Sequence, residues 1–377
     1  MKILIATPIF PPDIGGPATY SKILADELPK RGVDVDILSY GFISPGAPKI
    51  FRYLFYFLKI FKRALDADLL YAQDPVFGLA PCVASLILRK PFVLKVVGDY
   101  AWEQGVNRFG VKELLDEFLN TPYGWRIEFL RFVEKFVANR AHAVITPSQY
   151  LKSVVEKWGV GPEKIHVIYN SVSVSEISES KEGLRRELDL GGKILVSIGR
   201  LVPWKGFEML IELMPEISKK YPDAQLLIIG SGPEENTLKA KSYKALPTGR
   251  QVDANVKFLG SLPHEWVLKY LKAADIFLLN TGYEGFSHQI LEAMAVGVPV
   301  ISTHSGGNRE ILKDRQNCLV AGYNEKEAWI GAIFEFLEDQ NLYSNILQNS
   351  KIDIARFSGQ NMIEETLKVL NDVNASS

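Results

Sequence analysis

The chain has 377 residues, of which 47% are hydrophobic and 23% are charged, so it can bury large cores and is expected to form two domains. Its formal net charge of −1 gives no indication of nucleic acid or a polyanion as a partner. The only cysteines, Cys82 and Cys318, exclude a disulfide framework and a multi-cysteine metal site, and they are typical of a reducing cytosol.

Short β-rich segments alternate with amphipathic helical patterns along the chain, which predicts parallel sheets built from βαβ units. Residues 2–7 favour a first strand, because Pro11 and Pro12 end the apolar run before a signal-peptide core develops. No run of about 18 apolar residues predicts a spanning helix. The expected strands of the two halves are residues 2–7, 34–39, 68–72, 92–97 and 143–147, then 193–200, 224–232, 256–260, 275–280, 299–303 and 317–322.

A polar stretch over residues 171–183 interrupts this alternation and is interpreted as the junction between domains. The prediction is an α/β protein with a Rossmann-like domain over residues 1–174 and a second over 175–355. Residues 356–377 are expected to form a helix that packs back on the first domain. The formal charge is +4 for residues 1–172 and −5 for the remainder.

The loop after the first strand contains Gly15 and Gly16, and Pro17 can open the next helix at its first turn. Paired glycines let backbone amides approach a ligand closely, and ligands of open α/β sheets bind beyond the carboxyl ends of strands. A plain glycine-rich loop is the alternative interpretation. The dinucleotide fingerprint G-x-G-x-x-G is absent, which argues against a nicotinamide enzyme.

Two cations, Arg200 and Lys205, follow the first strand of the second half, beside the start of a helix. Their charge and the helix amides predict a clamp for a diphosphate, although solvated surface charges would give the same pattern. The next strand ends at Gly230, Ser231 and Gly232, a tight turn that leaves room for a ligand.

Glu284 lies in the loop after the expected strand 275–280, and Glu292 lies about two turns into the helix that follows. Carboxylates that line a ligand site favour hydroxyl groups as partners, because a buried carboxylate is costly unless it accepts hydrogen bonds. The amides that would favour an anion at this helix start belong to Gly285, Phe286 and Ser287. A pocket that binds a diol, a sugar and a phosphate together indicates a nucleotide sugar as the ligand. The alternative is that both glutamates are ordinary helix residues in solvent.

The segment EGFSHQILEAMAVGVPVIST resembles the E-x7-E signature of the retaining glycosyltransferases of family 4, which have the GT-B fold. The resemblance covers nearly the whole chain, is most specific over residues 142–320, and is weaker over 100–123, which we expect to vary with the acceptor. The other matching segments follow in the family's order: PPDIGGPATY, ITPSQYLKSVVEKWGVGPEKIHVIYNSV, IGRLVPWKGFEMLI, IIGSGPEENTL, VKFLGSLPHEWVLKYLKAADIFLLNT and ARFSGQNMIEETLKVL.

The resemblance implies a retaining hexosyltransferase that moves a sugar from a nucleotide diphosphate to a glycan, lipid or small-molecule acceptor. Two Rossmann-like domains would face each other across a cleft, the first on the acceptor side and the second on the donor side. By the resemblance, Glu292 would bind the ribose and Glu284 the donor sugar. Arg200 and Lys205 would neutralise the departing diphosphate, as a divalent cation does in other transferases, so no metal or other cofactor is expected.

The remaining family features concern the base, a metal motif and a histidine. Gly16 would approach the diphosphate, and the base would rest against Gly230, Ser231, Gly232 and the strand end at Leu259. The two D-x-D matches, Asp34/Asp36 and Asp66/Asp68, lie on or before strands and are interpreted as structural.

Where the family commonly has a histidine, this chain has Val97, and the nearest polar candidate for a catalytic role is Asp99. Glu103 follows it, and His288 lies near the donor pocket, whereas His142, His166, His264 and His304 lack metal-ligand spacing.

Two other function classes remain open from the residues alone. The chain is compatible with another nucleotide-sugar enzyme, such as an epimerase or a phosphorylase, or with a two-lobed sugar-binding protein without catalysis.

Residues 49–65 form a basic amphipathic pattern in which Lys49, Arg52, Lys59, Lys62 and Arg63 fall within roughly 140° of a helical wheel. One interpretation is a core helix with a solvated cationic edge. The other is a weak, salt-sensitive contact with an anionic membrane surface, for a cytoplasmic protein peripheral at the inner membrane face.

Overall fold

The computed structural model describes residues 1–377 except 14, 44–45, 47, 173–176, 243–254 and 377. The chain divides into two compact units, one formed by Met1–Asn170 with Gly359–Ser377 and the other by Ser171–Ser358. The boundary that the sequence places between residues 174 and 175 lies outside the described residues. We call these the first unit and the second unit.

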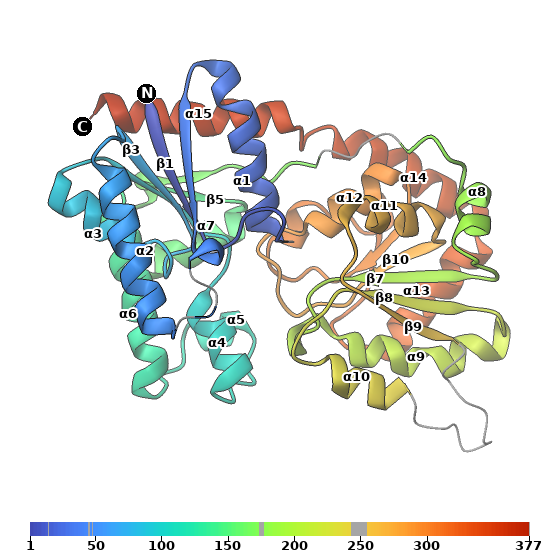
Figure 1. The fold of residues 1–377 in the computed structure, drawn as a ribbon. Coiled ribbons are helices and arrows are strands. Elements are labelled where there is room, and N and C mark those ends of the chain that lie inside the picture. The colour runs from blue at the N-terminus through green and yellow to red at the C-terminus, as the bar shows by residue number, and fades with distance from the viewer. Residues whose placement is uncertain (14, 44–45, 47, 173–176, 243–254, 377) are drawn as a thin grey trace. The chain divides into compact units, whose positions relative to one another are not determined.

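The first unit contains a six-stranded sheet in the order β2-β1-β3-β4-β5-β6, and all of its pairings are parallel (Figure 1). Strands buried on both faces of a parallel sheet require nearly continuous apolar runs, which is why they could be recognised in the sequence. The strands are β1 (Lys2–Thr7), β2 (Asp34–Ser39), β3 (Leu69–Gln73), β4 (Phe92–Lys95), β5 (Ala143–Thr146) and β6 (Ile165–Val167). The strand β6 was not expected from the sequence.

Helices cover both faces of this sheet. Helix α3 contacts both α2 and α6 on one face, whereas α1 and α15 share a core with the other face. That core joins Tyr20 and Leu24 of α1 to Met362 and Leu370 of α15, so residues from the end of the chain complete the first unit. The helices are α1 (Gly16–Glu27), α2 (Lys49–Ala64), α3 (Leu79–Leu88), α4 (Tyr100–Arg108), α5 (Leu115–Phe118), α6 (Trp125–Arg140), α7 (Gln149–Lys157) and α15 (Gly359–Ala375).

The second unit has a second six-stranded parallel sheet, in the order β12-β11-β10-β7-β8-β9. Its strands confirm the expected alternation: β7 (Ile194–Ile198), β8 (Gln225–Ile229), β9 (Val256–Gly260), β10 (Ile276–Leu279), β11 (Val300–Ser302) and β12 (Leu319–Val320). Its described helices are α8 (Lys181–Glu187), α9 (Phe207–Lys220), α10 (Glu235–Ser242), α11 (His264–Ala273), α12 (His288–Val296), α13 (Lys326–Glu338) and α14 (Gln340–Ile354).

Each sheet has one point at which the strand order reverses, between β1 and β3 in the first unit and between β7 and β10 in the second. At such a switch point the two following loops leave in opposite directions and open a crevice at the carboxyl ends of the strands. The fold therefore predicts ligand groups after β1, β3, β7 and β10. Within the described residues, no helix combines the length and the apolar character needed to cross a bilayer.

Candidate functional site

The loops after β7 and β10 are joined at the switch point of the second unit. The amide of Gly282 donates to the carbonyl of Trp204 at 2.8 Å. Asn280, fully buried at the end of β10, donates from its side chain to the carbonyl of Gly206 at 3.0 Å. These bonds hold the short 3₁₀ turn Pro203–Lys205 against the loop that carries Glu284.

Lys205 and Glu284 form an ion pair across this junction, through Lys205 Nζ and Glu284 Oε1. Their side chains are only 11% and 13% exposed, so both charges are largely withdrawn from water. Removing either partner would leave the other charge poorly solvated. An anionic ligand can replace Glu284 as the partner of Lys205, and the freed carboxylate can accept hydrogen bonds from hydroxyl groups.

The backbone around Glu284 is fixed by its neighbours. The amide of Gly307 donates to the carbonyl of Glu284 at 2.8 Å. Gly306 has φ +58°, and a Cβ at this residue would lie 2.1 Å from the same carbonyl oxygen, so only glycine fits there. Thr281 Oγ1 donates to the carbonyl of Tyr283 at 2.8 Å. The loop is therefore held in shape before any ligand binds.

Helix α12 begins directly after this loop. Ser287 caps it by accepting a hydrogen bond from the amide of Ile290 at 3.3 Å, and Gly297 ends it in the left-handed conformation. Phe286 is 5% exposed, and its ring packs against Phe357 at 5.4 Å between centroids. Gly285 precedes it beside Glu284. The positive end of the α12 dipole thus lies next to the Lys205–Glu284 pair and favours an anion there.

Glu292, farther along α12, is paired with His264 at the start of α11. Glu292 Oε1 lies 2.9 Å from His264 Nε2, and the Glu292 side chain is 17% exposed. The hydrogen bond to Glu292 raises the pKa of His264. Sequence reasoning assigned no role to His264, because the two residues are 28 positions apart and no spacing rule connects them.

The other donor residues predicted in the second unit also lie on loops after strands, apart from Leu259, which is half-buried on β9. Arg200 follows β7 and is exposed. Gly230 and Gly232 pack against backbone, since added Cβ atoms would lie 1.9 Å from the Gly199 oxygen and 2.3 Å from the Leu201 oxygen. These glycines permit close packing of the loops after β7 and β8. Ser231 Oγ lies 2.8 Å from Ser261 Oγ.

The predicted glycines of the first unit lie after β1. Gly15 has φ +155°, and an added Cβ would lie 2.8 Å from the side chain of Ile9. Gly16 is the first residue of α1, and Pro17 lies in the first turn, as the sequence predicts. These glycines thus follow β1, one of the two strands that border the switch point of the first unit.

Asp99 is an N-cap residue of α4, and its carboxylate accepts from the amide of Trp102 at 2.7 Å. It is 1% exposed, and burial raises its pKa to about 6. Beside it, the buried Glu134 accepts from the amide of Tyr100 at 2.7 Å. Local structure thus accounts for Asp99, and its catalytic role stays a prediction. Val97 follows β4 and supplies no polar group where the family has histidine.

Sequence reasoning missed Asp74, which follows β3 at the switch point of the first unit. Asp74 has φ 74° and accepts from the amide of Val76 at 2.8 Å. Burial raises its pKa to about 6. Its charge acts on the hydroxyls of Tyr53 and Tyr100, whose pKa values are raised by burial and secondarily by neighbouring groups that include Asp74. The available signal was its position, an acid directly after a buried strand.

The two D-x-D matches have structural partners. Asp36, on β2, pairs with Arg63 at 2.8 Å, and Asp68 accepts from the amide of Lys2 at 2.7 Å. Among the residues that the structure describes, no group of three His, Cys, Asp or Glu side chains is arranged to hold a metal ion.

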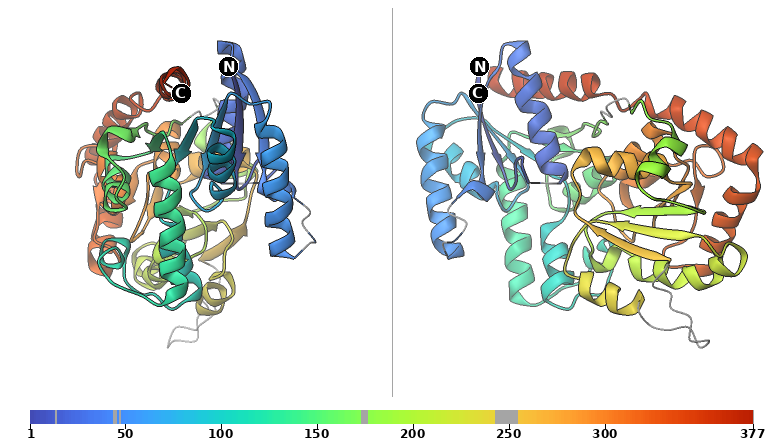
Figure 2. Two further views of the ribbon diagram at one scale, coloured as in Figure 1. Left: turned by 90° about the vertical axis from the view of Figure 1, so that its left-hand side faces the viewer. Right: turned by 45° about the vertical axis from the view of Figure 1, so that its right-hand side comes forward.

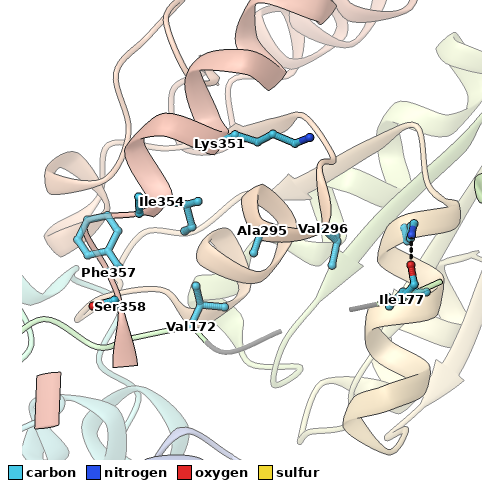
Figure 3. A pocket seen from close by; sticks show the side chains of 10 residues that line it. Val172, Ile177, Ala295, Val296, Lys351, Ile354, Phe357 and Ser358 are labelled. Carbon is cyan, nitrogen blue, oxygen red and sulfur yellow. Dashed lines mark hydrogen bonds between the residues drawn. The ribbon is translucent and has the colours of Figure 1, made fainter. Parts of the chain in front are cut away.

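A cavity of about 600 Å³ lies elsewhere in the second unit, beside the end of α12 (Figure 3). Ala295, Val296 and Phe357 line it, and Lys272 donates to the carbonyl of Ile177 at its edge. The predicted donor residues are not among its lining residues. The site at the switch point is therefore a separate feature, defined by its polar groups.

Two family models match the chain, and together they span most of it. "Glycosyltransferase Family 4" matches residues 14–176, and "Glycosyl transferases group 1" matches residues 180–353. These ranges agree with the first and second units. An uncharacterized glycosyltransferase of Methanocaldococcus jannaschii is 27% identical over 98% of this chain and 97% of its own length.

Two further proteins extend the comparison. A phosphatidylinositol N-acetylglucosaminyltransferase chain of Arabidopsis thaliana is 26% identical over 83% of this chain and 70% of its own. The crystal structure of Anabaena HepE in complex with UDP and glucose has the same fold, with a TM-score of 0.77, 21% identity and coverage of 98% of this chain and 99% of that one. The two parallel sheets, the site at the β7–β10 switch point and these matches show that the chain is a member of the group 1 and family 4 glycosyltransferases with the GT-B fold.

Proposed function

We propose that this glycosyltransferase moves a hexose from a nucleotide-diphosphate sugar to a hydroxyl acceptor with retained anomeric configuration and without a metal. The observation that carries the proposal is the Lys205–Glu284 pair, held beside the start of α12 at the switch point. Such a pair offers a cation for phosphate and a carboxylate for sugar hydroxyls at one place. The Anabaena structure bound to UDP and glucose supports a nucleotide-sugar donor.

In the proposed reaction, the bond from the anomeric carbon to the diphosphate oxygen breaks, and its electron pair leaves with the diphosphate. The acceptor oxygen forms the new bond on the same face of the sugar, and the acceptor proton passes to the departing phosphate. Negative charge grows on the leaving group, so Lys205 and Arg200 stabilise the transition state most strongly. No metal and no other cofactor is then required.

The remaining donor groups take the roles that the family resemblance implies. Glu284 is released from Lys205 and accepts hydrogen bonds from the sugar, while the amides of Gly285, Phe286 and Ser287 face sugar and phosphate. Glu292, oriented by His264, accepts from the ribose hydroxyls. The bare backbone at Gly15 and Gly16 approaches the diphosphate. The turn at Gly230, Ser231 and Gly232 and the strand end at Leu259 border the base.

The acceptor is a glycan, lipid or small molecule that the first unit binds. Asp99, at the start of α4, is the proposed catalytic carboxyl on the acceptor side. The Arabidopsis relative is named for phosphatidylinositol, which favours a lipid-linked acceptor. We place the protein in the cytoplasm, peripheral at the inner membrane face. The absence of acidic residues over residues 49–65 supports contact of this segment with an anionic surface.

The test is incubation of the protein with a panel of UDP, GDP and ADP sugars, with release of nucleotide followed over time. Slow hydrolysis of one donor, insensitive to EDTA, and an α-product from an α-donor by NMR would support the proposal. Donor binding without turnover, with every acceptor tried, would instead indicate a sugar-binding protein. An altered sugar without transfer would indicate an epimerase, and sugar phosphate formed only with added phosphate would indicate a phosphorylase.

A further inference from the structure

The first unit contains a cavity of about 420 Å³ between the end of α4 and the beginning of α6. None of the residues that line it belongs to the proposed donor site. Two arginines and three aromatic residues make up most of its lining: Arg108, Arg126, Phe109, Tyr123 and Trp125. Arginine, tryptophan and tyrosine are the residue types most enriched where proteins bind partners tightly. We call this cavity the α4–α6 pocket.

The α4–α6 pocket lies on the side of the sheet where ligands of α/β units bind. Helix α6 has 16 residues and is about 24 Å long, whereas the four residues of β5, the strand that follows it, span about 13 Å. Because α6 runs back toward the amino end of β5, its beginning lies roughly 10 Å past the carboxyl edge of the sheet. Figure 1 and the right view of Figure 2 show α4, α5 and the beginning of α6 there. The pocket is therefore on the ligand side of this unit.

Hydrogen bonds fix the segment that connects α4 to α6. Trp102, fully buried on α4, donates from its indole nitrogen to the carbonyl of Glu113 at 2.9 Å. The hydroxyl of Tyr123 donates to the carboxylate of the same Glu113 at 3.0 Å. From α6, Arg131 donates to the carbonyl of Thr121 at 2.9 Å. The segment is thus tied to both helices, so the pocket is formed before a ligand binds and little ordering is needed on binding.

Aromatic rings, and not an acid, position the guanidinium of Arg126. It lies 6.0 Å from the ring centre of Phe109 and 5.5 Å from that of Trp125. Contacts of a guanidinium with ring faces hold it in place and leave its N–H groups open to a ligand. Within the part of the chain that the structure describes, neither Arg126 nor Arg108 forms an ion pair or donates a hydrogen bond.

Two acids in the same segments have other partners. Glu128, in the first turn of α6, pairs with Arg131 at 2.8 Å and accepts from the amide of Tyr123 at 3.1 Å. Glu113 accepts from the hydroxyl of Tyr123. Neither acid is bonded to Arg108 or Arg126, so both guanidiniums can form bidentate hydrogen bonds with an anionic ligand.

The aromatic rings of the pocket define the rest of the ligand. Trp125 is 76% exposed and Phe109 is 39% exposed, so both rings offer surface to a ligand. Tyr123 stacks on Phe118 at 4.9 Å between centroids and is held in place. The face of an aromatic ring is electronegative, so the weakly positive C–H groups of a sugar ring pack against it. An inorganic anion would leave the rings uncovered, whereas a sugar with an acidic group would satisfy rings and guanidiniums together.

We propose that the α4–α6 pocket is a subsite for an acidic saccharide, in which Arg108 and Arg126 bind a carboxylate or phosphate on a sugar of the acceptor. This inference rests on the proposed function and narrows the acceptor to a charged glycan. Asp99 caps the start of α4 and Arg108 ends it, so the two lie about 14 Å apart along the helix. The sugar in the pocket is therefore not the one that reacts. The acceptor has at least two sugar residues.

The experiment is isothermal titration of the full chain, without donor, with acidic and neutral sugars. Trigalacturonic acid carries carboxylates and glucose 6-phosphate carries a phosphate; maltotriose and glucose are their neutral counterparts, and sulfate is an anion without a ring. The wild type should bind at least one acidic sugar about tenfold or more tightly than its neutral counterpart and than sulfate. The acidic sugar with the higher affinity assigns the acidic group as carboxylate or phosphate.

Variants of the two arginines test the pocket itself. Arg126→Gln should weaken binding of the acidic sugar about tenfold, and Arg108→Gln with Arg126→Gln should weaken it further, because each change removes charged hydrogen bonds. The matched control is Arg140→Gln. Arg140 is also exposed and lies 5.5 Å from the ring centre of Phe136, but it is the last residue of α6, far from the pocket. Its replacement should leave the affinity unchanged.

Tryptophan fluorescence locates the bound sugar. Trp125 is 76% exposed, whereas Trp266 of the second unit is 41% exposed and the other tryptophans are buried. A sugar that covers the Trp125 ring should shift the emission to shorter wavelength. In Trp125→Phe, which keeps an aromatic ring, the shift should disappear while the titration still detects binding. A shift that persists in this variant would place the sugar elsewhere and contradict the proposal.

Three further results would overturn the subsite: no binding of either acidic sugar, equal affinity for acidic and neutral sugars or for sulfate, or unchanged binding by the double arginine variant. All variants should keep their melting temperature, because the replaced side chains are exposed. Donor hydrolysis is measured in parallel, without any added saccharide. Saccharide binding without hydrolysis would refute the proposed function and keep the saccharide site, and hydrolysis without saccharide binding would refute the subsite alone.

Discussion

The two units share one plan, yet they hold the carboxylates that follow their strands differently. In the second unit, Glu284 and Glu292 each face a basic partner, Lys205 and His264. In the first unit, Asp74 and Asp99 accept hydrogen bonds from backbone amides, and burial raises the pKa of both to about 6. One unit thus holds its carboxylates by side chains that can carry the opposite charge, whereas burial in the other brings the pKa of the carboxyls closer to neutral pH.

The largest expected effect tests the charged pair of the second unit. Lys205→Ala should reduce kcat about 100- to 1,000-fold while weakening donor binding much less, because leaving-group charge is greatest in the transition state. Steady-state kinetics and donor titration would separate the two effects. The control is Lys326→Ala, a lysine that pairs with Glu212 at the surface of the same unit. Equal losses in binding and turnover would reduce Lys205 to a ground-state contact.

The variant Glu292→Gln tests the proposed contact between Glu292 and the ribose of the donor. Losing a hydrogen bond to a charged acceptor should weaken donor binding by about 1 to 3 kcal/mol, which isothermal titration with the preferred donor would measure. Turnover at saturating donor should change less, since the ribose is remote from the bond that breaks. Unaltered affinity would remove Glu292 from the donor site.

The rigidity of the second unit's loop is tested at Gly306. Gly306→Ala should lower the free energy of unfolding by about 1 to 3 kcal/mol and impair donor binding, because the new methyl group meets the Glu284 carbonyl at a positive φ. Gly331→Ala, in α13 with open space around it, should be neutral or stabilising. Urea unfolding of both variants gives the comparison. A neutral Gly306→Ala would mean that the loop adjusts freely.

The first unit provides a smaller effect at Asp99. Asp99→Ala should destabilise the protein by about 1 kcal/mol through loss of the α4 cap, whereas Asp99→Asn keeps a capping side chain and should not. Thermal unfolding would compare the two. Transfer rates give the second readout: reduced transfer by a stable Asp99→Asn variant, with intact donor binding, would show that the carboxyl also serves the reaction.

Much of this comparison was accessible from the sequence, and the missing parts have physical causes. Parallel strands are apolar on both faces, so most were recognised, but β6 has three residues with His166 in the middle. Lys205 and Glu284 could be placed after strands. Their pairing depends on β7 lying beside β10, which chain order does not predict. The wheel of residues 49–65 showed an apolar side, but only tertiary packing decides how much of it is covered.

The smallest expected effect distinguishes the two kinds of carboxylate by pH. Because the pKa of His264 is raised in the folded state, its pairing with Glu292 stabilises the fold fully below about pH 6.5, the ordinary histidine value. The contribution is lost as the pH rises through the raised value. The imidazole is half exposed, so solvent screening limits the pair to about 0.5 kcal/mol or less.

The measurement is the difference in free energy of unfolding between the wild type and His264→Gln, at pH 6 and at pH 8.5. The difference should be larger at pH 6 and vanish at pH 8.5. Because the pKa values of Asp74 and Asp99 are raised in the folded state, the free energy of unfolding also falls as the pH rises from about pH 4 to about pH 6. That loss is the same in the wild type and the variant, so it cancels in the difference. A difference that persists at pH 8.5 would show that His264 holds Glu292 as a neutral hydrogen-bond donor. Of the two carboxylates, Glu284 alone would then be held by an ion pair, with Lys205.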